Sequence, residues 1–229
     1  HLMRSGGKFG PMFKEVSQAL LDARDQKPMG AGGPVLSTLR AHIATNTRRP
    51  IRDVYREFAA WFVLSEDAPL ARSTTPDPVE CMDNPGRSLV VFPPRKADPA
   101  TGQSQYYKKP YTMDLPGGYT AKVFAVKPEV EAGSHVPRPM VVRPVALPTD
   151  TSLDIYCCPA GARVPGQPKP AASIEPEGKA VLVDVPANHI LYVIACNTSP
   201  ENAAKVEFEI SDYVITLEIT VDGQGVVGP

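Results

Sequence analysis

The stretch that decides the fold is KAVLVDVPANHILYVIACNTSPENAAKVEFEISDYVITLEITV, residues 179–221. It holds three apolar runs separated by turn residues, and it has almost no helical period. Apolar residues alternate with other residues over 181–185 and again over 206–210, whereas 190–195 is apolar throughout. Alternation is typical of a strand with one buried face, and a short unbroken run is typical of a strand covered on both faces. The sequence therefore predicts a β-rich C-terminal region with 190–195 as its central strand.

Further short runs of strand-forming residues lie on either side of this stretch. They span residues 88–92, 118–126, 140–147, 153–158 and 213–221. Pro144 interrupts one of them, which predicts an edge strand or a bulge there. About eight short strands joined by rigid loops fit an antiparallel β-sandwich of jelly-roll type.

The residues before this region have a helical period instead. Apolar positions predict helices beginning near Phe9, over 34–44 and over 50–65, so the expected fold class is α+β. The third helix carries Phe58 and Trp61, which we expect to have a structural role, with Trp61 largely buried. The predicted organisation is a helical subdomain at 1–67, a proline-rich linker at 68–87 and a β-sandwich domain at 88–229.

Composition excludes several classes of protein. The chain has 229 residues, a formal net charge of −1 and 26 prolines. A nucleic-acid binder usually has a basic excess, and none is present. No apolar run reaches the 18 or more residues that a membrane span needs. The composition therefore favours a globular protein that binds neither nucleic acid nor a bilayer.

The sequence contains no motif that assembles a catalytic site. It lacks HExxH, GxSxG and the phosphate-binding GxxxxGK[ST]. We therefore predict no catalytic residue, no metal ligand and no cofactor, and leave open the alternative of a structural calcium ion in a loop at Asp98 or Asp222. Whether the chain is an enzyme is left open, with the absence of activity in this chain alone preferred.

Four cysteines leave two readings open. No pair among Cys81, Cys157, Cys158 and Cys196 has the spacing of a zinc site. Neighbours on a strand face opposite ways, so only one of Cys157 and Cys158 faces the core. That residue either pairs with Cys196 or remains a buried thiol, and we assign Cys158 and Cys196 a structural role. A nucleophilic Cys196 assisted by His189 is much less common than a buried thiol.

Three polar or aromatic groups are candidate interaction sites. An aromatic and basic cluster precedes a strand; it consists of Tyr106, Tyr107, Lys108, Lys109 and Tyr111. Exposed tyrosines there would grip a glycan or a partner protein, while packing in the core is the plainer alternative. A basic corner at the third helix (Arg48, Arg49, Arg52 and Arg56) is either a solvated face or a phosphate site. Residues 197–199 match the N-glycosylation acceptor pattern, which matters only in a eukaryotic secretory host.

Several phrases of the chain resemble secreted bacterial zinc metallopeptidases of the broad HExxH superfamily. FGPMFKEV at 9–16 and IRDVYREFAAW at 51–61 are similar to late helices of their catalytic domains. LPGGYTA at 115–121 and LYVIACNTS at 191–199 are similar to parts of the β-sandwich that follows. The zinc-binding helix is absent, so no catalytic residue of that family has a counterpart here. The resemblance implies an accessory, post-catalytic part of such a protein.

Two functions from different classes fit these observations. The first is a non-catalytic binding or structural module of a secreted or surface protein, with a protein or a glycan as its partner and an extracellular or cell-surface location. The second is a viral or virus-like jelly-roll coat protein. Coat-protein arms that bind RNA are commonly basic, whereas residues 1–30 mix both signs of charge, which favours the first.

Overall fold

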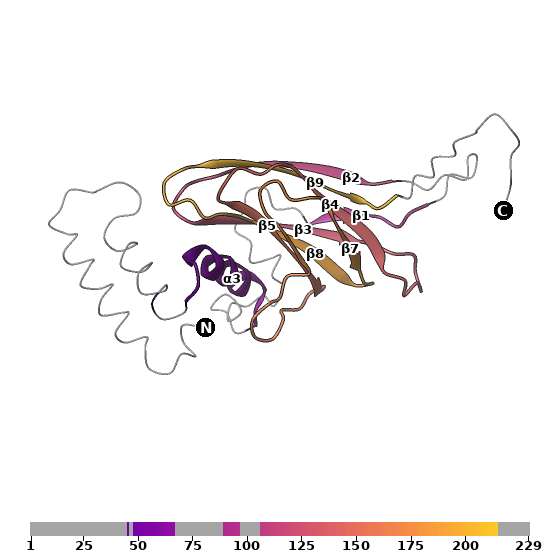
Figure 1. Cartoon of the computed structure of the whole chain (residues 1–229). Coiled ribbons are helices and arrows are strands. Elements are labelled where there is room, and N and C mark those ends of the chain that lie inside the picture. The colour runs from indigo at the N-terminus through magenta and orange to yellow at the C-terminus, as the bar shows by residue number, and fades with distance from the viewer. Residues whose placement is uncertain (1–44, 46–47, 67–88, 97–105, 215–229) are drawn as a thin grey trace, which may run out of the picture.

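The computed structural model describes residues 45, 48–66, 89–96 and 106–214, and this part of the chain is mostly β. Two sheets lie in layers, and one helix covers the outer side of one of them (Figure 1). The five-stranded sheet has the order β1-β3-β8-β5-β6, and the four-stranded sheet has the order β2-β9-β4-β7. The elements are α3 (Ile51–Leu64), β1 (Val90–Phe92), β2 (Lys108–Leu115), β3 (Thr120–Pro128), β4 (Arg138–Ala146), β5 (Thr151–Pro159), β6 (Ala172–Ile174), β7 (Val181–Val185), β8 (His189–Asn197) and β9 (Ala204–Asp212).

The antiparallel pairings from β2 to β9 are nested. The first of these strands pairs with the last, β3 with β8, β4 with β7, and β5 with β6. Two further pairings, β4 with β9 and β5 with β8, join the nested pairs into the two sheets. Only β1 differs, because it runs parallel to the end of β3. The chain from β2 to β9 is thus one long folded hairpin whose strands are shared between two layers.

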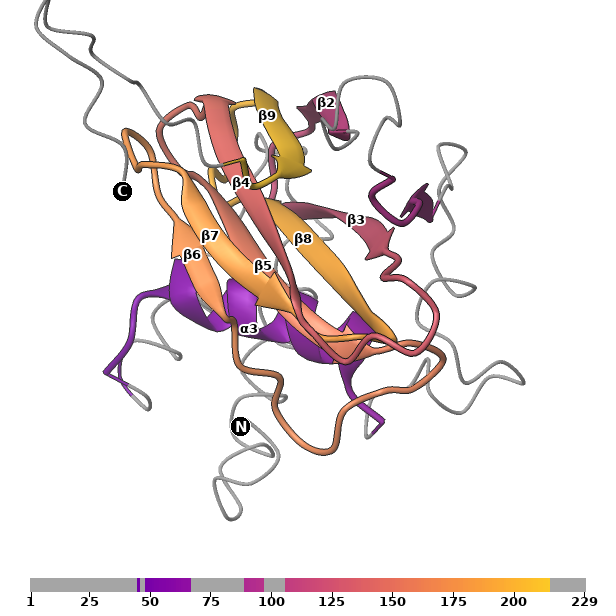
Figure 2. The same ribbon diagram turned by 90° about the vertical axis from the view of Figure 1, so that its right-hand side faces the viewer.

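Strand β8 is the centre of the five-stranded sheet, as the unbroken apolar run predicted. Its inner side chains, among them Leu191 and Val193, join a core with Phe208 and other residues of the opposite sheet. Its outer side chains, among them Tyr192 and Ile194, pack in a second core beneath α3. In Figure 2 the helix crosses the side of this sheet that faces away from β4 and β9. Burial on both faces explains why no polar residue interrupts the run.

Helix α3 turns its small residues toward the sheet. Ala59, Ala60 and Leu64 are its buried residues, while Trp61 is only partly buried and Phe58 is 51% exposed. The expected burial of the aromatic stripe is therefore met only in part. Small side chains allow a helix to approach a sheet closely, so the aromatic rings lie to the side and contact one another, with Phe58 and Trp61 centroids 6.0 Å apart.

Most predicted strands exist, with ends shifted by a few residues, but two strands were missed. Strand β2 begins with two lysines and a proline, a composition tolerated because β2 lies at the edge of its sheet. Strand β6 has only three residues. Pro144 lies in an inner strand, and the pairing with β9 shifts between Pro144 and Ala146, so the bulge alternative is correct. The chain leaves the sheet after Asp212, and Tyr213 and Val214 belong to no strand.

Several expectations fall outside the described residues. These are the first two helices, the linker at 68–87, Cys81, both proposed calcium ligands and residues 215–221 of the last predicted strand. The three-part division of the chain therefore stays a prediction. Within the described ranges, no helix is both long enough and apolar enough to cross a membrane.

Candidate functional site

The aromatic and basic cluster before β2 divides between the core and the surface. Tyr111 stacks on Phe208 with ring centroids 5.0 Å apart, and burial raises the pKa of its hydroxyl to about 12. Tyr107 also packs against the core. Tyr106, Lys108 and Lys109 are exposed. Packing thus accounts for two of the five candidate residues, and a binding role stays a prediction for the exposed three.

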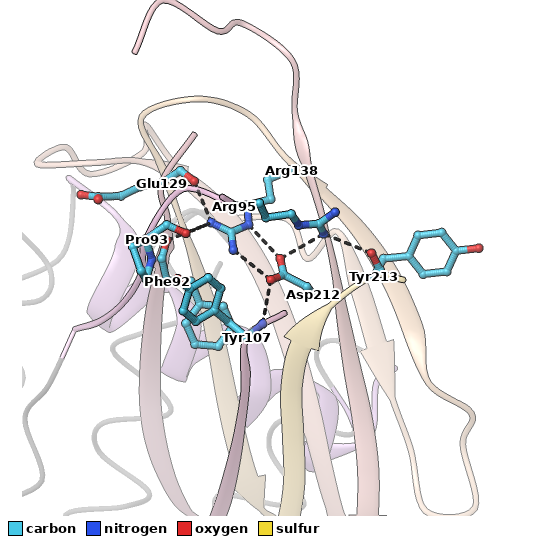
Figure 3. A network of polar contacts seen from close by, with 8 residues as sticks. All are labelled: Phe92, Pro93, Arg95, Tyr107, Glu129, Arg138, Asp212 and Tyr213. Atoms are coloured by element: carbon cyan, nitrogen blue, oxygen red, sulfur yellow. Dashed lines mark hydrogen bonds and ion pairs between the residues drawn. The ribbon is translucent and has the colours of Figure 1, made fainter. Parts of the chain in front are cut away.

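A buried ion pair lies directly beneath these exposed residues. Arg138, at the start of β4, donates from Nε and Nη2 to Asp212 at the end of β9, over 2.8 and 2.9 Å. Their side chains are 4% and 0% exposed. The remaining nitrogen, Nη1, donates to the backbone carbonyls of Phe92, Pro93 and Glu129 at 2.7–2.9 Å (Figure 3). One guanidinium therefore connects strands of both sheets at this end of the molecule.

The Asp212 carboxylate accepts hydrogen bonds from three residues: Arg138, Arg95 and Tyr107. Besides the fork of Arg138, Arg95 Nη2 donates to Oδ1 over 3.0 Å, and the backbone N–H of Tyr107 donates to Oδ2 over 3.0 Å. Burial by itself would raise the pKa of the Asp212 carboxyl, but these hydrogen bonds outweigh it and hold the pKa below its ordinary value. We call Arg95, Arg138 and Asp212 the Arg138 cluster. It fixes Tyr107, the residue just before β2, against the end of β9.

The basic corner of α3 is occupied by carboxylates. Arg56 donates to Asp154 on β5 over 2.8 and 2.5 Å and also pairs with Glu175. The hydrogen bond to Asp154 is the main reason that the pKa of Arg56 is raised. Arg49 makes a two-pronged pair with Glu57. The pairs of Arg56 dock the helix on the sheet, whereas the pair of Arg49 joins the residues before the helix to Glu57 within it. The structural reading of Arg49 and Arg56 is therefore favoured over phosphate binding.

The thiols of the described residues are free. Cys158 lies opposite Ile190 on β8, six residues from Cys196, which is too far for a disulfide. Burial raises the pKa of Cys158 to about 11 and that of Cys196 to about 12. His189 begins β8, so at a rise of about 3.3 Å per residue it lies roughly 23 Å from Cys196. The buried-thiol reading is correct for these cysteines, and the placement provides no nucleophile with a base.

The glycosylation pattern at 197–199 is a structural corner. The side-chain amide of Asn197 is buried and donates to the carbonyls of Leu115, Pro116 and Asn202 at 2.8–3.3 Å. Its oxygen accepts from the backbone N–H of Ser199 over 3.0 Å. The two segments that resemble the metallopeptidase β-sandwich, 115–121 and 191–199, thus contact each other here. Asn197 is inaccessible as a glycan acceptor, and packing explains why these residue types occur together.

Sequence reasoning missed the Arg138 cluster, although a signal exists. Arg138 precedes Met140 and Val142 in an alternation of inward positions, and Asp212 follows Phe208 and Ile210 in another. A charged residue at a core-facing position almost always has a partner. Nowhere in the described ranges is a group of three or more His, Cys, Asp and Glu residues placed to hold a metal ion.

Comparisons with known proteins give no family. No family model matches the chain, and no curated protein matches it. One solved structure with some likeness is PliG of Aeromonas hydrophila, a periplasmic inhibitor of g-type lysozyme. The sequences are 15% identical, the match covers 53% of this chain and 93% of that chain, and the TM-score is 0.28. A likeness this weak carries no argument about function.

Proposed function

We propose that this chain is a non-catalytic binding module, built on a jelly-roll β-sandwich, of a secreted or surface protein. The observation that carries the proposal is the exposed group of Tyr106, Lys108 and Lys109, which stands at the end of the molecule that the Arg138 cluster makes rigid. Aromatic side chains held on a rigid support are common at binding surfaces, because little conformational entropy is lost when a partner arrives. The partner is a protein or a glycan.

The nested strand pairing supports the jelly-roll part of this proposal. Eight strands are paired first with last and second with second last, and they are divided four and four between two layers, with β1 added at an edge. Jelly rolls of this kind occur in lectin domains, among others. Such folds present binding residues on sheet faces and loop ends while the core carries the stability.

The resemblance to zinc metallopeptidases adds a specific expectation about context. An accessory module of that family stands after a catalytic domain that contains HExxH. The test is the reading frame upstream of His1: an HExxH-containing domain there supports the accessory role, and an unrelated upstream sequence contradicts it.

The central experiment measures both turnover and binding. We expect the purified chain, supplied with zinc, to show no chelator-sensitive peptidase activity; robust chelator-sensitive turnover would overturn the proposal. In parallel, a biosensor panel of oligosaccharides and peptides compares the chain with Tyr106→Ala/Lys108→Ala/Lys109→Ala. The matched control is Lys169→Ala/Lys179→Ala, two lysines that are exposed outside the cluster. Loss of binding only in the first variant is the expected result.

A viral or virus-like coat protein is the second candidate, and the same nested pairing favours it, because jelly rolls also build viral capsids. The two candidates differ in their behaviour in solution. Size-exclusion chromatography with light scattering, over several salt concentrations, should show large assemblies for a coat protein. A monomer at high protein concentration would exclude this candidate.

A further inference from the structure

Strand β7 forms one edge of the four-stranded sheet, and of the described strands only β4 pairs with it. Along an antiparallel pair, residues alternate between those whose backbone N–H and C=O groups bond the neighbouring strand and those whose groups point away from it. The carbonyl of Pro139 on β4 accepts from the N–H of Tyr213, so the backbone groups of Pro139 face the β9 side rather than β7. Asp184, the residue paired with Pro139, therefore turns its backbone groups away from β4, and so does Leu182 two residues earlier.

The backbone groups of Leu182 and Asp184 are open to another chain. Within the described ranges no backbone hydrogen bond from another segment reaches either residue, and both side chains are exposed, that of Leu182 to 52%. The other edge of this sheet differs, because the carbonyl of Tyr107 accepts from the N–H of Asp212 and the alternation then puts Pro110 of β2 on its free side. Proline on an edge is one way in which natural sheets prevent pairing with another chain, and β7 lacks it.

The sequence that directly follows the described residues is strand-forming. Residues 215–221 read ITLEITV and lie outside the described part of the chain. Apolar side chains alternate with threonine or glutamate, and five of the seven residues are β-branched, a composition that favours a strand with one apolar face. Strand β7 has the same alternation on its inner side, where Val183 and Val185 are buried. The segment therefore matches β7 as a neighbouring strand whose apolar face extends the same core.

Charge favours one register for such a pairing. With Leu217 opposite Val183 in an antiparallel arrangement, every residue of β7 has a partner in the segment and the apolar faces coincide. Asp184 then lies opposite Thr216. A shift by two residues that keeps the apolar faces together places Glu218 opposite Asp184, and like charges directly opposite each other are destabilising.

The segment of the same chain is too short to reach this register. Tyr213 lies beside β4, so the free side of β7 is three strand spacings of about 4.8 Å away from it, roughly 14 Å in all. Thr216 is only three residues further along the chain, which spans at most about 11 Å when fully extended. The matching segment therefore has to come from a second copy of this chain.

We infer that residues 215–221 of one copy of this chain add to the free side of β7 in a second copy, as a fifth strand of its four-stranded sheet. A two-fold arrangement makes the exchange reciprocal and closes the pair, so the expected species is a dimer. Addition of a strand to an exposed edge is a common mode of recognition, in which backbone hydrogen bonds give affinity and alternate side chains give specificity. This self-association goes beyond the proposed binding function and does not depend on it.

Proline substitutions in the full chain test the two sides of the pairing separately. Size-exclusion chromatography with light scattering should give the parent chain the mass of a dimer. Leu182→Pro removes an N–H from the free side of β7 without taking a donor from the pairing with β4, so the fold should persist. Leu217→Pro interrupts the added segment instead. Each should raise the dissociation constant of the dimer roughly tenfold or more. The matched control is Thr112→Pro, which makes the same change on the free side of β2 and should leave the dimer intact.

Photochemical crosslinking identifies the segment that lies beside β7. With p-benzoylphenylalanine in place of Leu182, irradiation should give a product with the mass of two chains on a denaturing gel, and peptide mapping should locate the crosslink within 215–221. The same group in place of Thr112 should give no such product.

Four results would overturn the inference: a parent chain whose mass is not that of a dimer, a crosslink confined to one chain, a crosslink to a segment other than 215–221, or unchanged association of Leu217→Pro. Direct pairing of two β7 edges is excluded by the same data, since it would crosslink position 182 to β7 of the partner and would not respond to Leu217→Pro. None of these results bears on the binding module, which chelator-sensitive turnover refutes.

Discussion

Arg138 offers the sharpest test of how this molecule holds together, through the substitution Arg138→Met. Methionine keeps most of the volume but removes every donor, so Asp212 stays buried with only Arg95 and the N–H of Tyr107 as partners. Breaking a buried ion pair by removing one partner costs about 3–5 kcal/mol. The three carbonyl acceptors add less, because that of Phe92 also accepts from the N–H of Glu129 over 2.8 Å. We therefore expect a loss of about 4 kcal/mol in the free energy of unfolding.

Equilibrium urea unfolding, followed by far-ultraviolet circular dichroism, measures this loss. The matched control is Arg143→Met, an exposed arginine on the same strand, which should change the free energy of unfolding by less than about 0.5 kcal/mol. Arg138→Lys keeps a charge but not the planar fork, so it should fall between the two. If Arg138→Met were within about 1 kcal/mol of the control, neither the buried pair with Asp212 nor the bonds of Arg138 to the other sheet would contribute importantly to stability.

Three further predictions follow from single residues. Because the folded-state pKa of Asp212 is lowered, its contribution is fully present above the ordinary value of 3.8 and is lost as the pH falls toward the folded value; acid unfolding of Asp212→Asn should lack that component, and an unchanged acid profile would contradict it. Asn197→Ala should lower the free energy of unfolding by about 2 kcal/mol, measured in urea, because the buried carbonyl of Leu115 and the carbonyls of Pro116 and Asn202 lose a donor; a stability equal to that of the parent would contradict a structural role of Asn197. At pH 8 the folded chain should leave Cys158 and Cys196 unreactive toward a thiol reagent until it is unfolded in urea, since with a pKa of about 11 or higher about one thiol in a thousand or fewer is ionised; mass mapping that finds either one labelled in the folded state would contradict their burial.

The sequence predicted a strand correctly where the burial of that strand requires an apolar composition. Strand β8 is buried on both faces, so nearly every residue in it is apolar and the run is visible without a structure. Strand β2 is at an edge with one face in water, so Lys108, Lys109 and Pro110 hide it among loop residues. Helix α3 was visible from its period, but not which side it buries. That choice depends on the close approach that Ala59 and Ala60 allow.

The candidate surface was predictable only as a composition. Tyr106 and Tyr107 are adjacent and chemically identical, so the sequence alone gives no reason to send one outward and the other inward. The register of the sheet decides it, because a shift of one residue would exchange the two faces. Tyr213 was placed at the start of a strand, whereas the chain leaves the sheet after Asp212.

The same alternation links the stability of this end of the molecule to its surface. Each of two dipeptides, Tyr106-Tyr107 and Asp212-Tyr213, sends one residue inward and one outward. The inward pair is bonded to itself and to Arg138, so the backbone that carries the two outward rings has little freedom left. A buried ion pair is weak evidence for stability in general, but here its geometry fixes the position of two exposed aromatic side chains. The link between the Arg138–Asp212 pair and the positions of Tyr106 and Tyr213 explains why a charged pair occupies core-facing positions where apolar residues would also pack.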